Sequence, residues 1–163
     1  MKKVCWLLIL VLVIGCFVGC QQAPAAQRPI ENEDGTLADW MKEEIEEAYK
    51  KKCFDEHGIE NATFNWWSPK NPTGMEAMYY GTYDGYVMYC KNLAATEYDV
   101  QEILGFKFIF PSHHALRAYK DGEFFSLYEL TDQGLLGEEA IRIAYEHYTE
   151  IRRIQNEYYD QLG

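Results

Sequence analysis

Serine, basic residues and glycine-rich motifs are scarce in this chain of 163 residues. Only three serines occur (Ser68, Ser112 and Ser126), and none stands in the G-x-S-x-G sequence of a hydrolase nucleophile. The phosphate-binding sequences G-x-x-x-x-G-K-[ST] and G-x-G-x-x-G are missing too. The chain has 15 Lys plus Arg against 26 Asp plus Glu, a formal charge of −11. Because a surface this negative repels phosphate backbones, no nucleic-acid partner is expected.

The longest uncharged run lies at the N-terminus. Met1-Lys2-Lys3 precedes seventeen residues without charge, Val4 to Cys20, which is typical of a secretory signal. The run ends in Phe17-Val18-Gly19-Cys20 and turns polar directly afterwards. A small residue before a Cys at this place resembles the lipobox of bacterial lipoproteins, which have a type II signal peptide. For residues 1–20 the resemblance implies removal of residues 1–19, lipidation of Cys20, and a lipid-anchored domain on the extracytoplasmic face of the bacterial cell membrane.

A second lipobox candidate, Val13-Ile14-Gly15-Cys16, overlaps the first. The residues after Cys16 are still apolar, whereas those after Cys20 can leave the bilayer, and this favours Cys20. An uncleaved membrane helix and an ordinary cleavage after residues 23–25 are alternatives. Loss of residues 1–19 removes two lysines and leaves 13 basic against 26 acidic residues, a charge of −13.

Composition divides the rest of the chain into a tether and one domain. Residues 20–35 mix Gln, Ala, Pro and acidic residues without apolar periodicity, which predicts a disordered tether. The single domain is expected over 36–163. Thr36 is a candidate N-cap with Asp39 as its capping-box partner, and the apolar spacing that follows predicts a helix over about 37–54.

The remainder of the domain predicts an α+β fold. Two Asp-Gly pairs, at 84–85 and 121–122, are typical hairpin turns. Ser126 is a candidate cap for a short helix ending near Gln133, and a long helix begins at about Glu138. The expected architecture is an antiparallel meander of five or six short strands, an N-terminal helix and two C-terminal helices. The predicted strands are 62–67, 75–83, 86–90, 105–110, 114–120 and 123–125.

Three segments of the domain carry a second resemblance. They are Tyr79-Tyr80-Gly81-Thr82-Tyr83-Asp84-Gly85, residues 118–127 (AYKDGEFFSL), and Gly134-Leu135-Leu136 before a helix. Together they resemble small uncharacterised exported proteins of anaerobic Gram-positive bacteria, over about residues 37–148. The resemblance supports the domain boundary and implies no activity.

Candidate residues for metal, redox or acid–base chemistry are few. Outside the export segment only Cys53 and Cys90 remain, 37 positions apart, and they form either a disulfide or two buried thiols. His113 and His114 are adjacent on a predicted strand, so their side chains point to opposite faces and cannot chelate one ion together. His57 and His147 are interpreted as surface residues. Glu97, Asp99 and Glu102 lack the spacing of a calcium loop and are interpreted as an acidic helical turn. No metal, cofactor or catalytic residue is expected.

Aromatic residues are the remaining candidates for function. If helices cover only one face of the sheet, the other face presents Tyr and Trp side chains suited to a protein or glycan partner. If helices cover both faces, these side chains form the core. The candidates for the recognition surface are Trp66, Trp67, Tyr79, Tyr80, Tyr83 and Tyr86. The leading hypothesis is therefore a lipid-anchored, non-catalytic recognition module of the cell envelope. The alternatives are a small extracytoplasmic hydrolase using carboxylates and a His, and a structural assembly subunit.

Overall fold

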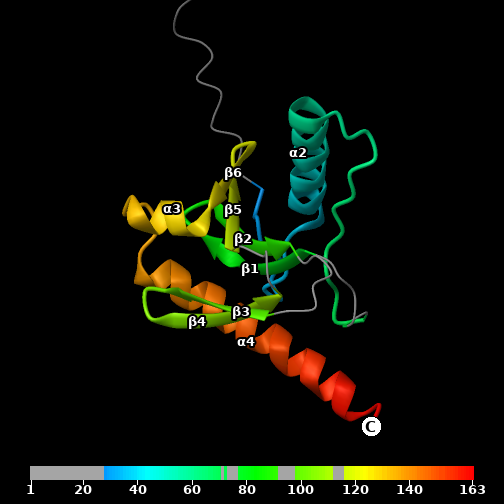
Figure 1. Cartoon of the computed structure of the whole chain (residues 1–163), viewed down its shortest axis with the longest axis vertical. Helices are drawn as coiled ribbons and strands as arrows, with labels where there is room; N and C mark the ends of the chain where they lie inside the picture. The colour runs from blue at the N-terminus through cyan, green and yellow to red at the C-terminus, as the bar shows by residue number, and fades with distance from the viewer. Residues whose placement is uncertain (1–27, 71, 73–76, 92–97, 112–115) are drawn as a thin grey trace, which may run out of the picture.

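The protein has an α+β fold in which a four-stranded antiparallel sheet lies beside a separate two-stranded hairpin (Figure 1). The computed structural model describes residues 28–70, 72, 77–91, 98–111 and 116–163. The prediction of fold class is confirmed. The elements are α2 (Asp39–His57), β1 (Ala77–Tyr83), β2 (Tyr86–Lys91), β3 (Tyr98–Ile103), β4 (Phe106–Pro111), β5 (Leu116–Lys120), β6 (Glu123–Ser126), α3 (Leu127–Asp132) and α4 (Glu138–Asp160).

Helix α2 begins two residues later than predicted and without a side-chain cap. Its N-cap residue is Ala38, and the Thr36 hydroxyl instead donates a hydrogen bond to Asp34 Oδ1 at 2.6 Å. The predicted capping box is therefore wrong, because a local turn uses the hydroxyl that would have capped the helix. At the other end Gly58 takes a positive φ of 67°, and its N–H donates to the carbonyl oxygen of Phe54 at 2.9 Å. This C-terminal glycine motif closes the helix.

Both Asp-Gly pairs lie at hairpin tips, as predicted. Asp84 and Gly85 join β1 to β2 with φ of 47° and 77°, and Asp121 and Gly122 join β5 to β6 with φ of 51° and 87°. Two successive residues with positive φ match the right-handed twist of the flanking strands. Leu104-Gly105, with φ of 48° and 85°, makes the same turn between β3 and β4. This tip is not predicted from the sequence, because Leu rarely adopts positive φ.

The strands do not form one meander. The sheet order is β1-β2-β5-β6, and the β3–β4 hairpin leaves the sheet between β2 and β5. The predicted strand 62–67 contributes only a single bridge, from Trp66 to Ala77. The acidic turn expected around Asp99 and Glu102 is instead strand β3, because the alternating Tyr98, Val100 and Glu102 pair with residues of β4.

Helices and the hairpin cover the two faces of the sheet (Figure 1). Side chains alternate along each strand, so neighbouring residues enter different cores. The α2 side contains Leu37, Met41, Ile45, Phe64, Ala77, Val87, Tyr89 and Tyr119. The opposite side, with α4 and the hairpin, contains Met78, Tyr80, Met88, Cys90, Phe108, Phe110, Ile141 and Ala144 among others. Each fully buried large apolar side chain stabilises the fold by about 1.5–3 kcal/mol.

The ordered domain begins upstream of Thr36. Ala38 N–H donates to the Ile30 carbonyl at 2.8 Å, and the Trp40 indole N–H donates to the Pro29 carbonyl at 3.0 Å. Residues 28–35, which composition assigned to the tether, therefore form a turn attached to α2. The rest of that tether and the export segment, residues 1–27, lie outside the described residues.

Helix α4 is buried along its first part only. Its buried residues end at Ile151, Ile154 and Tyr158 are half-buried, and Tyr159 is exposed. Figure 1 shows the C-terminal part of α4 extending beyond the β3–β4 hairpin. Among the residues that the structure describes, no helix combines the length and apolar character of a membrane span.

Candidate functional site

The six aromatic residues predicted as a recognition surface do not form an exposed sheet face. Tyr80 is 1% exposed and lies in the core under α4. Trp66 packs with the α2-side core and Trp67 with the opposite one. Tyr79, Tyr83 and Tyr86 are half-buried. Elements cover both faces of the sheet, so the alternative in which these side chains contribute to the core holds for Tyr80, and the other five are packed beside the two cores.

No disulfide joins Cys53 and Cys90; both are buried thiols. Cys53 lies on α2, whereas Cys90 packs in the core on the opposite face of the sheet. A disulfide needs Cα atoms within about 7 Å, so the sheet itself keeps the two apart. Burial raises the pKa of the Cys90 thiol to about 12, which keeps it protonated and unreactive.

The described part of the chain shows no cluster of metal-ligating side chains. No group of three or more His, Cys, Asp or Glu side chains there could hold a metal ion. His113 and His114 lie outside the described residues.

A cleft of about 710 Å³ opens where the two Asp-Gly hairpin tips meet the start of α2. We call it the tip cleft. It is lined by Arg28, Ile30, Trp40, Met41, Glu44, Asp84, Gly85, Tyr119, Lys120 and Asp121. These residues come from the N-terminal turn, the first turns of α2, the β1–β2 tip and the β5–β6 tip. Its volume lies within the range of small-molecule sites.

Hydrogen bonds hold the walls of the tip cleft in place. The Tyr119 hydroxyl donates to Glu44 Oε1 at 2.8 Å and so joins β5 to α2. Burial, followed by this hydrogen bond to Glu44, raises the pKa of Tyr119 well above its ordinary value, so the phenol remains a donor at neutral pH. Lys120 Nζ donates to the Asp84 carbonyl at 2.8 Å and lies 4.3 Å from the centre of the Tyr86 ring. The two hairpin tips are thereby tied together.

The tip cleft combines charges of both signs with an apolar wall. Arg28 and Lys120 are cationic, and Glu44, Asp84 and Asp121 are anionic. Ile30, Met41 and the half-buried Trp40 supply the apolar wall. A strongly charged ligand would meet repulsion from one set of these groups. The lining instead suits a ligand that both donates and accepts hydrogen bonds and has an apolar face.

A second polar group lies at the β1 edge of the sheet, where α4 crosses it. The Tyr79 hydroxyl donates to the Glu31 carboxylate and is 2.7 Å from Thr82 Oγ1. The ring of His147 contacts the Tyr79 ring edge-on at 5.3 Å between centroids. Burial is the main cause that raises the pKa of Tyr79 above its ordinary value, and burial lowers the pKa of His147. Tyr79 is therefore a protonated donor and His147 a neutral ring at pH 7, an arrangement that fastens the N-terminal turn to the sheet.

Neither group is predicted from the sequence, in which His147 is interpreted as a surface residue and Asp84 and Asp121 are explained as turn residues alone. The partners of each group are separated by tens of positions in the chain, as Glu44 and Tyr119 show, so no local spacing could reveal them. Comparison with protein-family models, curated proteins and solved structures finds no match for this chain.

Proposed function

We propose that the protein is a lipid-anchored lipoprotein of the bacterial cell envelope whose domain binds a small polar ligand, without catalysis, in the tip cleft. The anchor is supported by the sequence alone. An uncharged run ends in Gly19-Cys20 and is followed by polar residues. The domain would then stand outside the membrane, where envelope glycans and secreted molecules are the available ligands.

The observation that carries the binding proposal is the lining of the tip cleft. Trp40 offers a flat apolar surface, and Arg28, Lys120 and Asp121 offer donors and acceptors around it. Sugar rings present the matching combination of an apolar face and equatorial hydroxyl groups. A saccharide unit of an envelope glycan is therefore the ligand class that the lining fits best.

The hydrolase alternative receives less support. It requires a histidine and carboxylates together in one cleft. The residues lining the tip cleft include three carboxylates but no histidine. Of those carboxylates, Glu44 already accepts a hydrogen bond from the Tyr119 hydroxyl. Of the two histidines that the structure describes, His147 is half-buried, and it contacts Tyr79 at the β1 edge instead.

The anchor is tested by replacing Cys20 with Ser and following the protein with an alkyne-labelled fatty acid and by cell fractionation. The expected result is loss of the lipid label and of cleavage before residue 20. The matched control, Cys16→Ser, should keep both. Retained labelling in Cys20→Ser with loss in Cys16→Ser would assign the anchor to Cys16, and no labelling in the wild type would refute lipidation.

Ligand binding is tested with soluble glycan fragments of peptidoglycan, titrated into the detergent-solubilised protein and measured by calorimetry. Trp40→Ala and Lys120→Gln should each weaken binding by at least about tenfold, since the first removes the flat apolar surface and the second removes a cationic hydrogen-bond donor. The matched control is Glu123→Gln, an exposed carboxylate next to the cleft that does not line it. Equal affinity in all variants, or no binding by the wild type, would refute this ligand class.

A further inference from the structure

The β3–β4 hairpin presents an apolar surface to solvent. Tyr98 and Val100 of β3 are 62% and 64% exposed, and Ile109 of β4 is 44% exposed. Val100 is paired directly with Ile109, so these side chains lie on the same side of the hairpin. We call the side formed by Tyr98, Val100 and Ile109 the hairpin face. Three neighbouring exposed apolar side chains form an apolar patch on this two-stranded sheet, the kind of surface feature at which partners bind.

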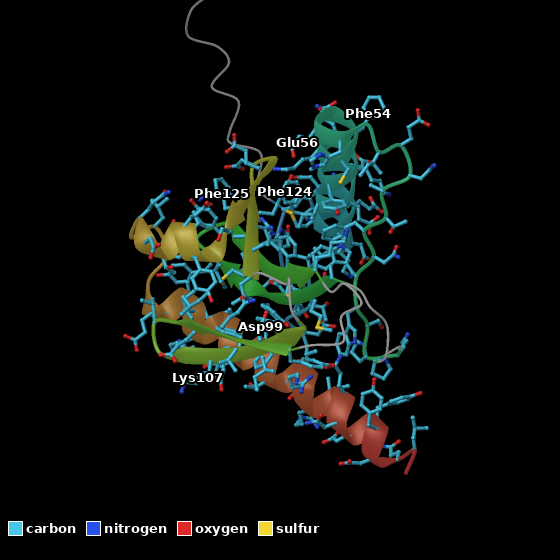
Figure 2. All side chains as sticks on the ribbon, in the orientation of Figure 1. Phe54, Glu56, Asp99, Lys107, Phe124 and Phe125 are labelled. Atoms are coloured by element: carbon cyan, nitrogen blue, oxygen red, sulfur yellow. The ribbon has the colours of Figure 1, made fainter. Side chains whose placement is uncertain are left out.

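The other side of the hairpin packs against the rest of the domain. Ile103, Phe108 and Phe110 are buried there. The Phe108 ring contacts the ring of Tyr148 on α4 at 5.3 Å between centroids. The inner side thus attaches the hairpin to α4 and leaves the hairpin face pointing away from the domain. Figure 2 shows the hairpin, marked by Asp99 and Lys107, on the opposite side of the sheet from α2, marked by Glu56.

The two edges of the hairpin differ. On the β4 edge, Ile109 N–H donates to the Tyr148 hydroxyl at 3.0 Å, and that hydroxyl is 3.4 Å from the Ile109 carbonyl oxygen. Ile109 therefore directs its backbone groups away from β3, so the Val100–Ile109 pair is not hydrogen-bonded across the hairpin. By the same alternation, Tyr98, Val100 and Glu102 direct their N–H and C=O groups away from β4. Among the described residues β3 pairs with β4 alone, so α4 caps one edge of the hairpin and no described strand pairs with the other, which we call the open edge of β3.

The charge of β3 favours one kind of partner at this edge over the others. Asp99 and Glu102 are exposed on β3, and Lys107 of β4 is 3.8 Å from Glu102. A second copy of the chain would bring its own Asp99 and Glu102 to the same edge and so add like charge there. An anionic membrane surface would repel the domain in the same way. An extended segment with basic residues would meet the opposite charge.

We infer that the open edge of β3 and the hairpin face bind an extended segment of another protein, with alternating basic and apolar residues, as a third strand. Backbone hydrogen bonds to Tyr98, Val100 and Glu102 would hold the segment, and its apolar side chains would cover the hairpin face. Its basic side chains would lie near Asp99. This site is separate from the tip cleft, so a negative result for one proposal would leave the other unaffected.

The test uses a fluorescent eight-residue peptide of alternating Lys and Val and the detergent-solubilised full chain, measured by fluorescence anisotropy. The Lys–Val peptide should bind, and a matched Glu–Val peptide should bind at least about tenfold more weakly. Hydrogen exchange should show new protection at the amides of Tyr98, Val100 and Glu102 when the Lys–Val peptide is bound. Failure of that peptide to bind, or equal binding of both peptides, would overturn the inference.

Two variants probe the edge and the face separately. Val100→Pro removes an N–H that points away from β4, so it should block the added strand and leave the hairpin paired. Tyr98→Lys places a cation on the hairpin face and should weaken the Lys–Val peptide by at least about tenfold even if the proline variant does not fold. The matched control is Leu135→Lys, because Leu135 is an exposed apolar residue outside the hairpin. Unchanged binding in Tyr98→Lys would refute the site.

The other occupants are also measured. Sedimentation of the protein should show no association that Tyr98→Lys abolishes. Vesicles of anionic phospholipid should bind the Cys20→Ser protein no more tightly than they bind its Tyr98→Ser form, a variant that removes the aromatic ring without adding a cation that would itself attract the lipid. A dimer that depends on Tyr98 would assign the surface to a second copy, and vesicle binding that depends on Tyr98 would assign it to the membrane. Either result would overturn the inference.

Discussion

Gly81 is a position where α4 lies close to the sheet, and replacing it with Ala should be strongly destabilising. Gly81 lies at the irregularity in β1 between Tyr79 and Thr82 and has φ of +89°. A Cβ added there would lie 2.6 Å from Ile143 Cγ2 and 3.1 Å from His147 Cδ2, both on α4. Positive φ costs a residue with a Cβ about 1–2 kcal/mol. Overpacking against Ile143 adds about 1–3 kcal/mol. The free energy of unfolding should therefore fall by about 2–5 kcal/mol.

Gly122 supplies a matched control for the conformational part of this cost. Its φ is +87°, nearly that of Gly81, but a Cβ there would have nothing within 4 Å. Gly122→Ala should therefore cost only the about 1–2 kcal/mol of positive φ. The difference between the two variants measures the close approach of α4 to β1. Urea unfolding, with midpoint and slope fitted for each variant, gives both values.

A double-mutant cycle locates the overlap. Ile143→Ala removes the methyl group nearest to the added Cβ, so combining it with Gly81→Ala should recover a large part of the excess over Gly122→Ala. Recovery should be incomplete because His147 remains close. Equal destabilisation by Gly81→Ala and Gly122→Ala, or additive effects of the two substitutions in the cycle, would refute the argument that contact with α4 requires glycine at this place.

Three further predictions concern the third hairpin tip, the buried thiol and the end of α4. Leu104 is exposed and has φ of 48°, so Leu104→Gly should raise the free energy of unfolding by about 0.5–1 kcal/mol, measured by urea unfolding; no gain would mean that the turn is not strained. Cys90 has a raised pKa of about 12, so at pH 8 its thiol should react with a disulfide reagent at the rate of unfolding rather than of an exposed thiol. Removing residues 157–163 should leave the melting temperature within about 3 °C of the wild type. Removing all residues after Tyr148 also removes the buried Ile151, so this truncation should lower the melting temperature several times more than the shorter one. Equal melting temperatures of the two truncated forms would place the end of the core before Ile151.

Local chemistry allowed several features to be predicted from the sequence. The Asp-Gly pairs at 84–85 and 121–122 lie at hairpin tips because positive φ at two successive residues favours Asp and Gly whatever surrounds them. The 23-residue α4 follows from an apolar repeat within one stretch of chain, with buried residues such as Ile141, Ala144 and Tyr148 at helical spacing. The lipobox-like end of the apolar run at Cys20 is equally local, and it stays a prediction.

Which elements contact each face of the sheet depends on the tertiary structure and not on any one segment of sequence. Tyr79 and Tyr80 have the same side chain and neighbouring positions, but one bonds Glu31 at a sheet edge and the other is enclosed beneath α4. The pairing of β2 with β5 across the β3–β4 hairpin, the positive φ of Leu104 and the meeting of Glu44 with Tyr119 likewise depend on contacts between distant residues. Such contacts form because several elements bury their apolar sides together. No single segment of sequence encodes that shared burial, so it could not be read from residue spacing.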